Sequence, residues 1–149
     1  MALAFPRLPL DVEIKGTGPD ATAAVELLAA ELEGLDRVDS TVVASFDAAS
    51  VALMRERLPR VALSPGLDTL AAWVRSGDPL GDYAVIQVPQ FHQGIEVIPL
   101  VLGRAHAEGS ALWVWLDHPG RETTEHYRQL IDAGVDGVIA ASPSRWPRT

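Results

Sequence analysis

The 149-residue chain contains no cysteine, which excludes a disulfide framework and any thiolate metal site. It also lacks an apolar run of the roughly 18 residues that a membrane-spanning helix needs. Basic residues are few: twelve against twenty acidic ones give a net charge of -8. This balance argues against nonspecific binding to nucleic acid or anionic membranes. It leaves room for a small phosphate-bearing substrate, because the local field and not the net charge decides that binding.

Two further patterns are missing. The first six residues lack the charged n-region and long apolar h-region of a signal peptide, so the sequence as written predicts a cytoplasmic location. No Gly-x-Gly-x-x-Gly or P-loop pattern follows a predicted strand, which weakens a nucleotide-binding interpretation. What is present is a composition that is 48% hydrophobic, enough to bury a core, in a length that suggests one domain over residues 1–149.

Strand and helix patterns alternate along the chain. Strands are predicted at 12–15, 41–46, 61–63, 84–88, 111–116 and 138–141. Helices are predicted at 21–33, 48–58, 67–75, 96–107 and 121–133, with Asp20 and Asp47 as N-caps, a loop at 90–94 and an irregular tail at 142–149. Successive strand centres are about 20 to 30 residues apart, as in βα repeats that form a parallel sheet. A complete (β/α)8 barrel takes at least about 200 residues, so six units indicate either an open doubly wound sheet or a barrel that lacks two units.

The first strand carries the candidate site. Val12 and Ile14 alternate with Glu13 and Lys15, so the acid and the base leave the strand on one side, near its carboxyl end. Functional sites of parallel α/β proteins lie at the carboxyl ends of strands. An ion pair on a solvated rim, without function, explains the same spacing.

Five stretches, taken together and in order, resemble the glycerophosphodiester phosphodiesterases, which are (β/α)8-barrel phosphoric diester hydrolases. The run from Leu10 to Gly16, after Phe5-Pro6, resembles that family's third-strand signature. The later stretches are Ser45-Phe46, 105–109 (AHAEG), Val114-Trp115 and 134–139 (GVDGVI), and Gln87-Val88-Pro89 matches a subset of the family. The resemblance implies an incomplete TIM-type barrel of about six parallel strands, with the first two βα units absent.

The resemblance also implies an activity and a set of site residues. Glu13 would be a ligand of a divalent cation (Ca²⁺ or Mg²⁺), Lys15 would contact the substrate phosphate, and Trp115 would line the glycerol or leaving-group side. The implied reaction belongs to lipid metabolism: a glycerophosphodiester and water give an alcohol and glycerol 3-phosphate. Carboxylate oxygen suits a hard cation, and an anionic transition state needs positive charge at its oxygens.

The sequence differs from the family in the motifs that supply the family's catalytic residues. The family's first strand ends in His-Arg-Gly, followed by Glu-Asn-Thr, and its second carries an Asp and a second His, but this chain begins just before the third strand. Leu116-Asp117-His118 and Ala140-Ala141 replace two further family motifs. No residue is therefore assigned as catalytic, and Glu13 alone would bind a cation weakly if at all. We expect little or no turnover, and a misplaced start at Met1 or a broken gene would explain the missing units.

Several residues have simpler interpretations. His92 and His118 fall in loops, where proton transfer or plain exposure is possible, and His106 in the last turn of a helix favours capping of the helix dipole. His126 is predicted on a solvated polar face with Glu122.

Two other functions compete with hydrolysis. A non-catalytic barrel fragment could bind an anion or a partner, or pair with itself through the open edges of its first and last strands. An unrelated open α/β binding protein is the third possibility.

Overall fold

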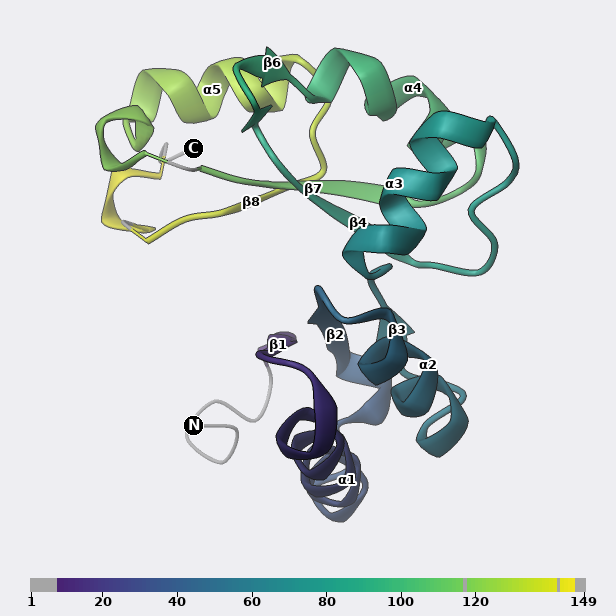
Figure 1. Cartoon of the computed structure of the whole chain (residues 1–149). Helices are drawn as coiled ribbons and strands as arrows, with labels where there is room; N and C mark the ends of the chain where they lie inside the picture. Colours follow the sequence, from purple (N-terminus) through teal and green to yellow (C-terminus); the bar gives the residue numbers. More distant parts are fainter. Residues whose placement is uncertain (1–7, 117, 142, 147–149) are drawn as a thin grey trace. The chain divides into compact units, whose positions relative to one another are not determined.

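A computed structural model of the chain describes residues 8–116, 118–141 and 143–146. The chain divides into two compact units, Met1–Val85 and Ile86–Thr149. Each unit contains parallel strands joined by helices (Figure 1). That the two units together form one partial domain stays a prediction. Within the described residues, no helix is both long enough and apolar enough to cross a bilayer.

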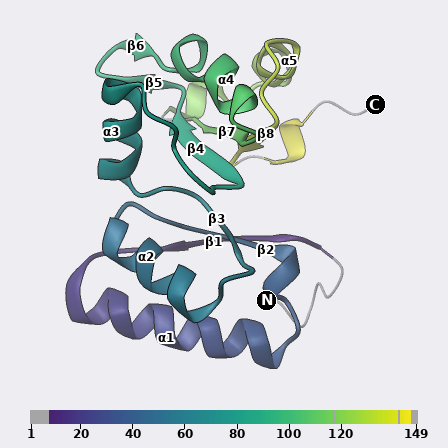
Figure 2. The ribbon, with the colours of Figure 1, turned by 90° about the vertical axis from the view of Figure 1, so that its right-hand side faces the viewer.

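The first unit is a three-stranded parallel sheet with helices on one face. Its strands follow the order β1 (Leu10–Ile14), β2 (Thr41–Ser45), β3 (Ala62–Leu63), in a register that places Val12 beside Val43 and Val43 beside Leu63. The connecting helices are α1 (Gly18–Gly34) and α2 (Ala48–Arg57), and a short 3-10 turn (Val38–Ser40) precedes β2. Figure 2 shows α1 and α2 on the same side of the sheet. The helix α3 (Leu67–Ser76) follows β3.

The core of this unit follows from the strand and helix periods. Ile14 and Val43 point to the helix side of the sheet, where Val25 of α1 and Met54 of α2 are completely buried. The buried residues of α1 recur every three or four positions, as the covered stripe of a helix requires: Ala21, Val25, Ala29 and Leu32. This packing leaves the other face of β1, with Glu13, exposed.

The second unit also consists of a three-stranded sheet with helices on one face. Its sheet has the order β4 (Val85–Pro89), β7 (Ala111–Trp115), β8 (Gly137–Ile139), and β7 and β8 are parallel. The helices α4 (Ile98–Ala107) and α5 (Thr124–Asp132) lie on one side of β7 and β8 (Figure 1). Leu112 and Val114 are fully buried, whereas Trp113 and Trp115, on the opposite face of β7, are only half-buried. Two 3-10 turns, Pro119–Arg121 and Pro143–Arg145, complete the unit.

Strand order separates the two fold predictions. A doubly wound sheet reverses its strand order at a switch point. Here, parallel strands that follow each other along the chain also lie next to each other, in both sheets. Sequential order is the arrangement of a (β/α) barrel wall.

The hairpin between β4 and α4 was not predicted. β5 (Phe91–His92) and β6 (Ile95–Glu96) pair antiparallel, in place of the predicted loop at 90–94. Gln93 and Gly94 both have positive φ, 51° and 79°, which is the geometry of a two-residue hairpin turn. Because the hairpin takes up residues 91–96, the helix predicted from 96 begins only at Ile98.

Of the two predicted N-cap residues, Asp47 is confirmed and Asp20 is wrong. Asp47 accepts hydrogen bonds from Ser50 N at 3.1 Å and Ser50 Oγ at 2.7 Å, which confirms it as the N-cap of α2. Asp20 does not cap α1: the helix begins at Gly18, with Pro19 in its first turn, and Asp20 lies inside that turn. The last helix begins at Thr124 instead of 121, because Pro119–Arg121 forms a 3-10 turn and Thr123 Oγ1 accepts from His126 N.

Candidate functional site

The acid and the base predicted at the end of the first strand do converge. Lys15 Nζ lies 2.6 Å from Glu13 Oε2, just where β1 ends. The Lys15 side chain is 75% exposed and that of Glu13 35% exposed, so a solute can reach both. Lys15 Nζ also lies 5.8 Å from the centre of the Phe46 ring, which follows β2. The ammonium group thus stands at the carboxyl end of two adjacent strands, held between a carboxylate and an aromatic face.

The end of β2 is tied to the end of β1 by a buried hydroxyl. Ser45 Oγ donates to Ile14 O at 2.9 Å and accepts from Asp47 N at 3.2 Å. With both roles of the hydroxyl used, Ser45 is a structural residue of the strand ends. Its bonds fix the turn that carries Lys15 relative to the turn that carries Phe46.

The residues around Glu13 do not fit a tightly held divalent cation. Among the described residues, no group of three His, Asp or Glu side chains is arranged to hold a metal ion. One oxygen of Glu13 is already in contact with Lys15. Ca²⁺ takes six to eight oxygen ligands, and Mg²⁺ six, so one carboxylate supplies too few. We therefore derive no reaction step through a metal here.

Trp115 is the last residue of β7, in the second unit. It is half-buried on the same face as Trp113, two positions earlier, as the strand period predicts. Trp113 lies against β8, where a Cβ at Gly137 would come within 2.6 Å of the indole ring. Glycine at this position lets the ring lie flat on the neighbouring strand. The structure thus brings together Glu13 and Lys15, and gives Trp115 the face of β7 that the helices leave open.

A buried carboxylate at the strand ends was missed from the sequence. Glu122 was predicted on a solvated helix face, but it precedes α5 and is only 4% exposed. Its Oε1 accepts from Ala141 N, just after β8, at 3.0 Å, and its Oε2 accepts from the Tyr127 hydroxyl at 3.3 Å. Burial raises the pKa of the Tyr127 hydroxyl, and the negative charge of Glu122 raises it further. Glu122 therefore anchors the chain where it leaves β8.

Two of the histidines, His118 and His126, make hydrogen bonds within the fold that the sequence did not predict. His118 Nδ1 accepts from Gly120 N at 3.0 Å in an exposed turn, and His92 lies exposed on β5. His126 is not on a solvated face: its Nε2 lies 2.8 Å from Oε1 of the buried Gln90. Asp117 lies outside the described residues, as do residues 142 and 147–149 of the predicted tail, whereas residues 143–145 form a 3-10 turn.

His106 lies in the last turn of α4, as predicted, but its side chain pairs with Asp136 instead of capping the helix. The distance between His106 Nε2 and Asp136 Oδ2 is 2.7 Å, and the same oxygen accepts from Leu112 N at 2.8 Å. Burial opposes the charged carboxylate of Asp136, but the bonds from Leu112 and His106 outweigh it and lower its pKa. The pair fastens α4, β7 and the approach to β8 at the amino ends of the strands.

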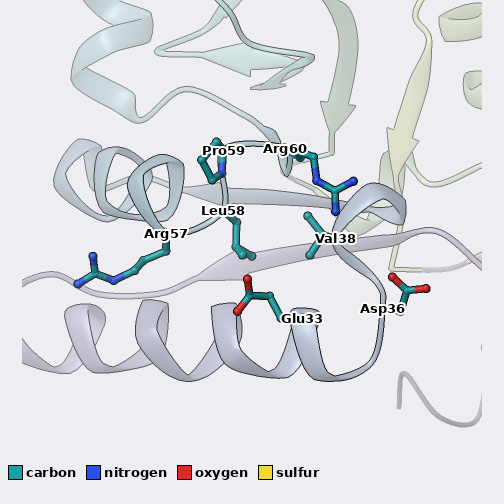
Figure 3. A pocket seen from close by; sticks show the side chains of 7 residues that line it. All are labelled: Glu33, Asp36, Val38, Arg57, Leu58, Pro59 and Arg60. Atoms are coloured by element: carbon teal, nitrogen blue, oxygen red, sulfur yellow. The ribbon is translucent and has the colours of Figure 1, made fainter.

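A second charged cluster, at the opposite end of the first sheet, is not part of this site. It surrounds a cavity of about 180 Å³ between the end of α1 and the turn after α2 (Figure 3). Arg57 there donates three hydrogen bonds to Glu26, and Arg60 Nη1 lies 2.8 Å from Asp39 Oδ2. Val38 and Arg60 precede β2 and β3, so this cavity lies at the amino ends of the strands, where barrels place residues for stability.

No family model matches the sequence, and no curated protein matches it. Solved structures do match the fold. A glycerophosphodiester phosphodiesterase from Parabacteroides distasonis gives a TM-score of 0.71 at 17% identity over 96% of this chain and 57% of its own. A second from that organism gives 0.57 at 19% identity over 95% and 52%. A protein described as such an enzyme from Galdieria sulphuraria gives 0.68 at 17% identity over 93% and 55%.

These similarities define the fold class. The chain spans about half the length of the structures it matches. Together with the sequential order of its parallel strands, this identifies the fold as an incomplete (β/α)8 barrel of the glycerophosphodiester phosphodiesterase type. At these identities the likeness concerns the fold, and function has to be argued from the site.

Proposed function

We propose that the chain is a glycerophosphodiester phosphodiesterase-like domain whose remaining site binds the phosphate of a glycerophosphodiester. The observation that supports this most is the convergence of Lys15 and Glu13 at the carboxyl end of β1, on a fold shared with phosphodiesterases. An exposed ammonium group is a suitable point charge for a phosphate oxygen. Its neighbour Phe46 offers an apolar contact for the carbon atoms of the same substrate.

The proposed roles follow the resemblance residue by residue. Lys15 contacts the phosphate, and Trp115 lines the glycerol or leaving-group side. Glu13 is the candidate ligand of Ca²⁺ or Mg²⁺, which would supply electrostatic stabilisation of the phosphate when bound. With Lys15 at 2.6 Å and too few other carboxylates near, we propose that Glu13 binds the cation only weakly. Glu13 instead keeps the Lys15 ammonium in place.

We expect little or no hydrolysis by this chain. A general acid and a general base must lie within hydrogen-bonding reach of the reacting atoms, whereas the side chains described in contact with Lys15 are Glu13 and Phe46, neither of which is a histidine. The purified chain, assayed with glycerophosphocholine and either Ca²⁺ or Mg²⁺, should release no more choline than a Lys15→Ala control. Turnover close to that of a complete glycerophosphodiester phosphodiesterase would refute this expectation.

The second candidate is a non-catalytic fragment that binds an anion or pairs with another chain. Strand edges favour the pairing version: β1 and β8 each end a sheet, and exposed edges can add further strands. Light scattering of the purified chain distinguishes the two versions. A dimer supports completion of the barrel by a second copy, and a strictly monomeric species counts against it.

A further inference from the structure

A second cavity, of about 400 Å³, lies within the second unit. Its walls come from the first turns of α4 and from the inner side of α5, and its polar end comes from the hairpin that precedes α4. Small-molecule pockets have volumes of about 300–1,000 Å³ and combine apolar walls with a few polar groups. Pro99, Leu102 and Leu130 supply apolar surface here. The size and the lining suit a small amphiphilic molecule.

The polar end is a connected chain of hydrogen bonds. Gln90 is 3% exposed, and its Nε2 lies 3.4 Å from Glu96 Oε1, while its Oε1 lies 2.8 Å from His126 Nε2. On the far side of the ring, His126 Nδ1 lies 3.2 Å from Gln129 Oε1. All four side chains line the cavity. Burying an amide is costly unless it is bonded on both sides, so this network is a built feature of the cavity.

The network determines which atoms accept hydrogen bonds from a ligand. A carboxylate only accepts, so Gln90 turns its amino group toward Glu96 and its oxygen toward His126. His126 then donates through Nε2 to Gln90 Oε1, and its Nδ1 faces Gln129. Gln129 is exposed and can turn its amide toward this atom or away from it. The polar end thus presents one acceptor group to a ligand, the Glu96 carboxylate, which uses one oxygen for Gln90.

The net charge around the cavity is negative, which favours the same hydrogen-bond-donating ligand. Glu96 carries a full negative charge, while the start of α4 contributes about half a positive one. The start of α5 is offset by Glu125 in its first turn. Among the described residues, none of those that line the cavity is a lysine or an arginine. The excess is therefore negative, and a ligand with several N–H donors and a positive charge fits it best.

We propose that this cavity binds a small organic cation, with a primary ammonium group at Glu96 and a short alkyl body between α4 and α5. The site shares no residue with the phosphate site of the proposed function, because its lining belongs to the second unit whereas Glu13 and Lys15 belong to the first. Its ligand class is also different, because Lys15 selects anions and Glu96 selects cations.

The test is a titration of the full chain followed by NMR of its backbone amides, with three probes of equal length: n-butylammonium, n-butanol and n-butyrate. We expect n-butylammonium to shift residues around the cavity and to bind about fivefold more tightly than n-butanol, with n-butyrate weakest. Glu96→Gln should abolish the preference for the cation. Glu31→Gln is the matched control: it removes the same charge from an exposed position of α1 in the first unit and should leave the preference unchanged.

Three outcomes overturn the proposal: equal affinities for the three probes, an unchanged preference in Glu96→Gln, or no saturable shifts at the cavity residues. A second variant, Leu102→Phe, fills the space between the helices and should weaken binding of both n-butylammonium and n-butanol. If n-butylammonium binds this folded variant as well as the wild type, the cavity is not its site. If Leu102→Phe does not fold, the Glu96→Gln comparison decides alone.

Discussion

Glu122→Ala is expected to lower the free energy of unfolding by about 2–4 kcal/mol, because it leaves two donors, one of them fully buried, without their acceptor. One is the hydroxyl of Tyr127, a residue with no exposed surface, and the other is Ala141 N, where the chain leaves β8. The small cavity left by the side chain adds to the loss. The measurement is chemical denaturation of the wild type and the variant under the same conditions.

Two further variants distinguish the effect of losing the hydrogen bonds of Glu122 on stability from the effect of losing a negative charge. Glu125→Ala removes a carboxylate three residues away whose side chain is 74% exposed, and it should change stability by less than about 0.5 kcal/mol. Glu122→Gln keeps one acceptor oxygen, so its free energy of unfolding should lie between those of Glu122→Ala and Glu125→Ala. A Glu122→Ala protein as stable as Glu125→Ala would show that the bonds to Tyr127 and Ala141 contribute little.

Gly66→Ala is expected to destabilise the first unit by about 1–3 kcal/mol through overpacking. Gly66 precedes α3, and a Cβ there would lie 2.8 Å from both the N and the Cα of Ala48, at the start of α2. These are backbone atoms, so the neighbour cannot move away by changing a rotamer. The φ of Gly66, -69°, suits alanine, so the expected loss comes from contact and not from backbone strain.

Gly34→Ala is the control for this prediction. Gly34 is the last residue of α1, and a Cβ there meets nothing within 4 Å. That substitution should leave stability unchanged or raise it by about 0.5–1 kcal/mol, as expected for alanine in place of glycine in a helix. Equal stability of Gly66→Ala and Gly34→Ala would mean that the strand-end turn after β3 does not pack against α2.

The parts of the fold that depend on local patterns were predictable. The alternation in β1 placed Glu13 and Lys15 on one side, and the same period placed Trp113 and Trp115 on one face of β7. Asp47, a capping residue directly before a helix pattern, was found as the N-cap. The strand order, by contrast, was not predictable from local patterns. A barrel and a doubly wound sheet have the same βα repeats, and only the pairing of the strands distinguished them.

The parts that depend on contacts between distant residues were not predictable. Glu122 lies among polar residues in the sequence, and only its bond to Ala141, nineteen positions later, makes it a buried group. His126 was interpreted as solvated for the same reason, although Gln90, thirty-six positions earlier, holds it. The hairpin at 91–96 had a local signal in Gln93-Gly94, but glutamine is not a common residue at positive φ.

The central claim, that Lys15 binds a phosphodiester phosphate at the end of β1, is tested most directly by calorimetric titration of the chain with glycerophosphocholine. Lys15→Ala should weaken binding about tenfold, since a hydrogen bond to a charged group is worth about 1.5–3 kcal/mol. Arg60→Ala removes the same charge at the opposite end of the sheet and should bind like the wild type. No binding by the wild type, or equal binding by Lys15→Ala and Arg60→Ala, would contradict the claim.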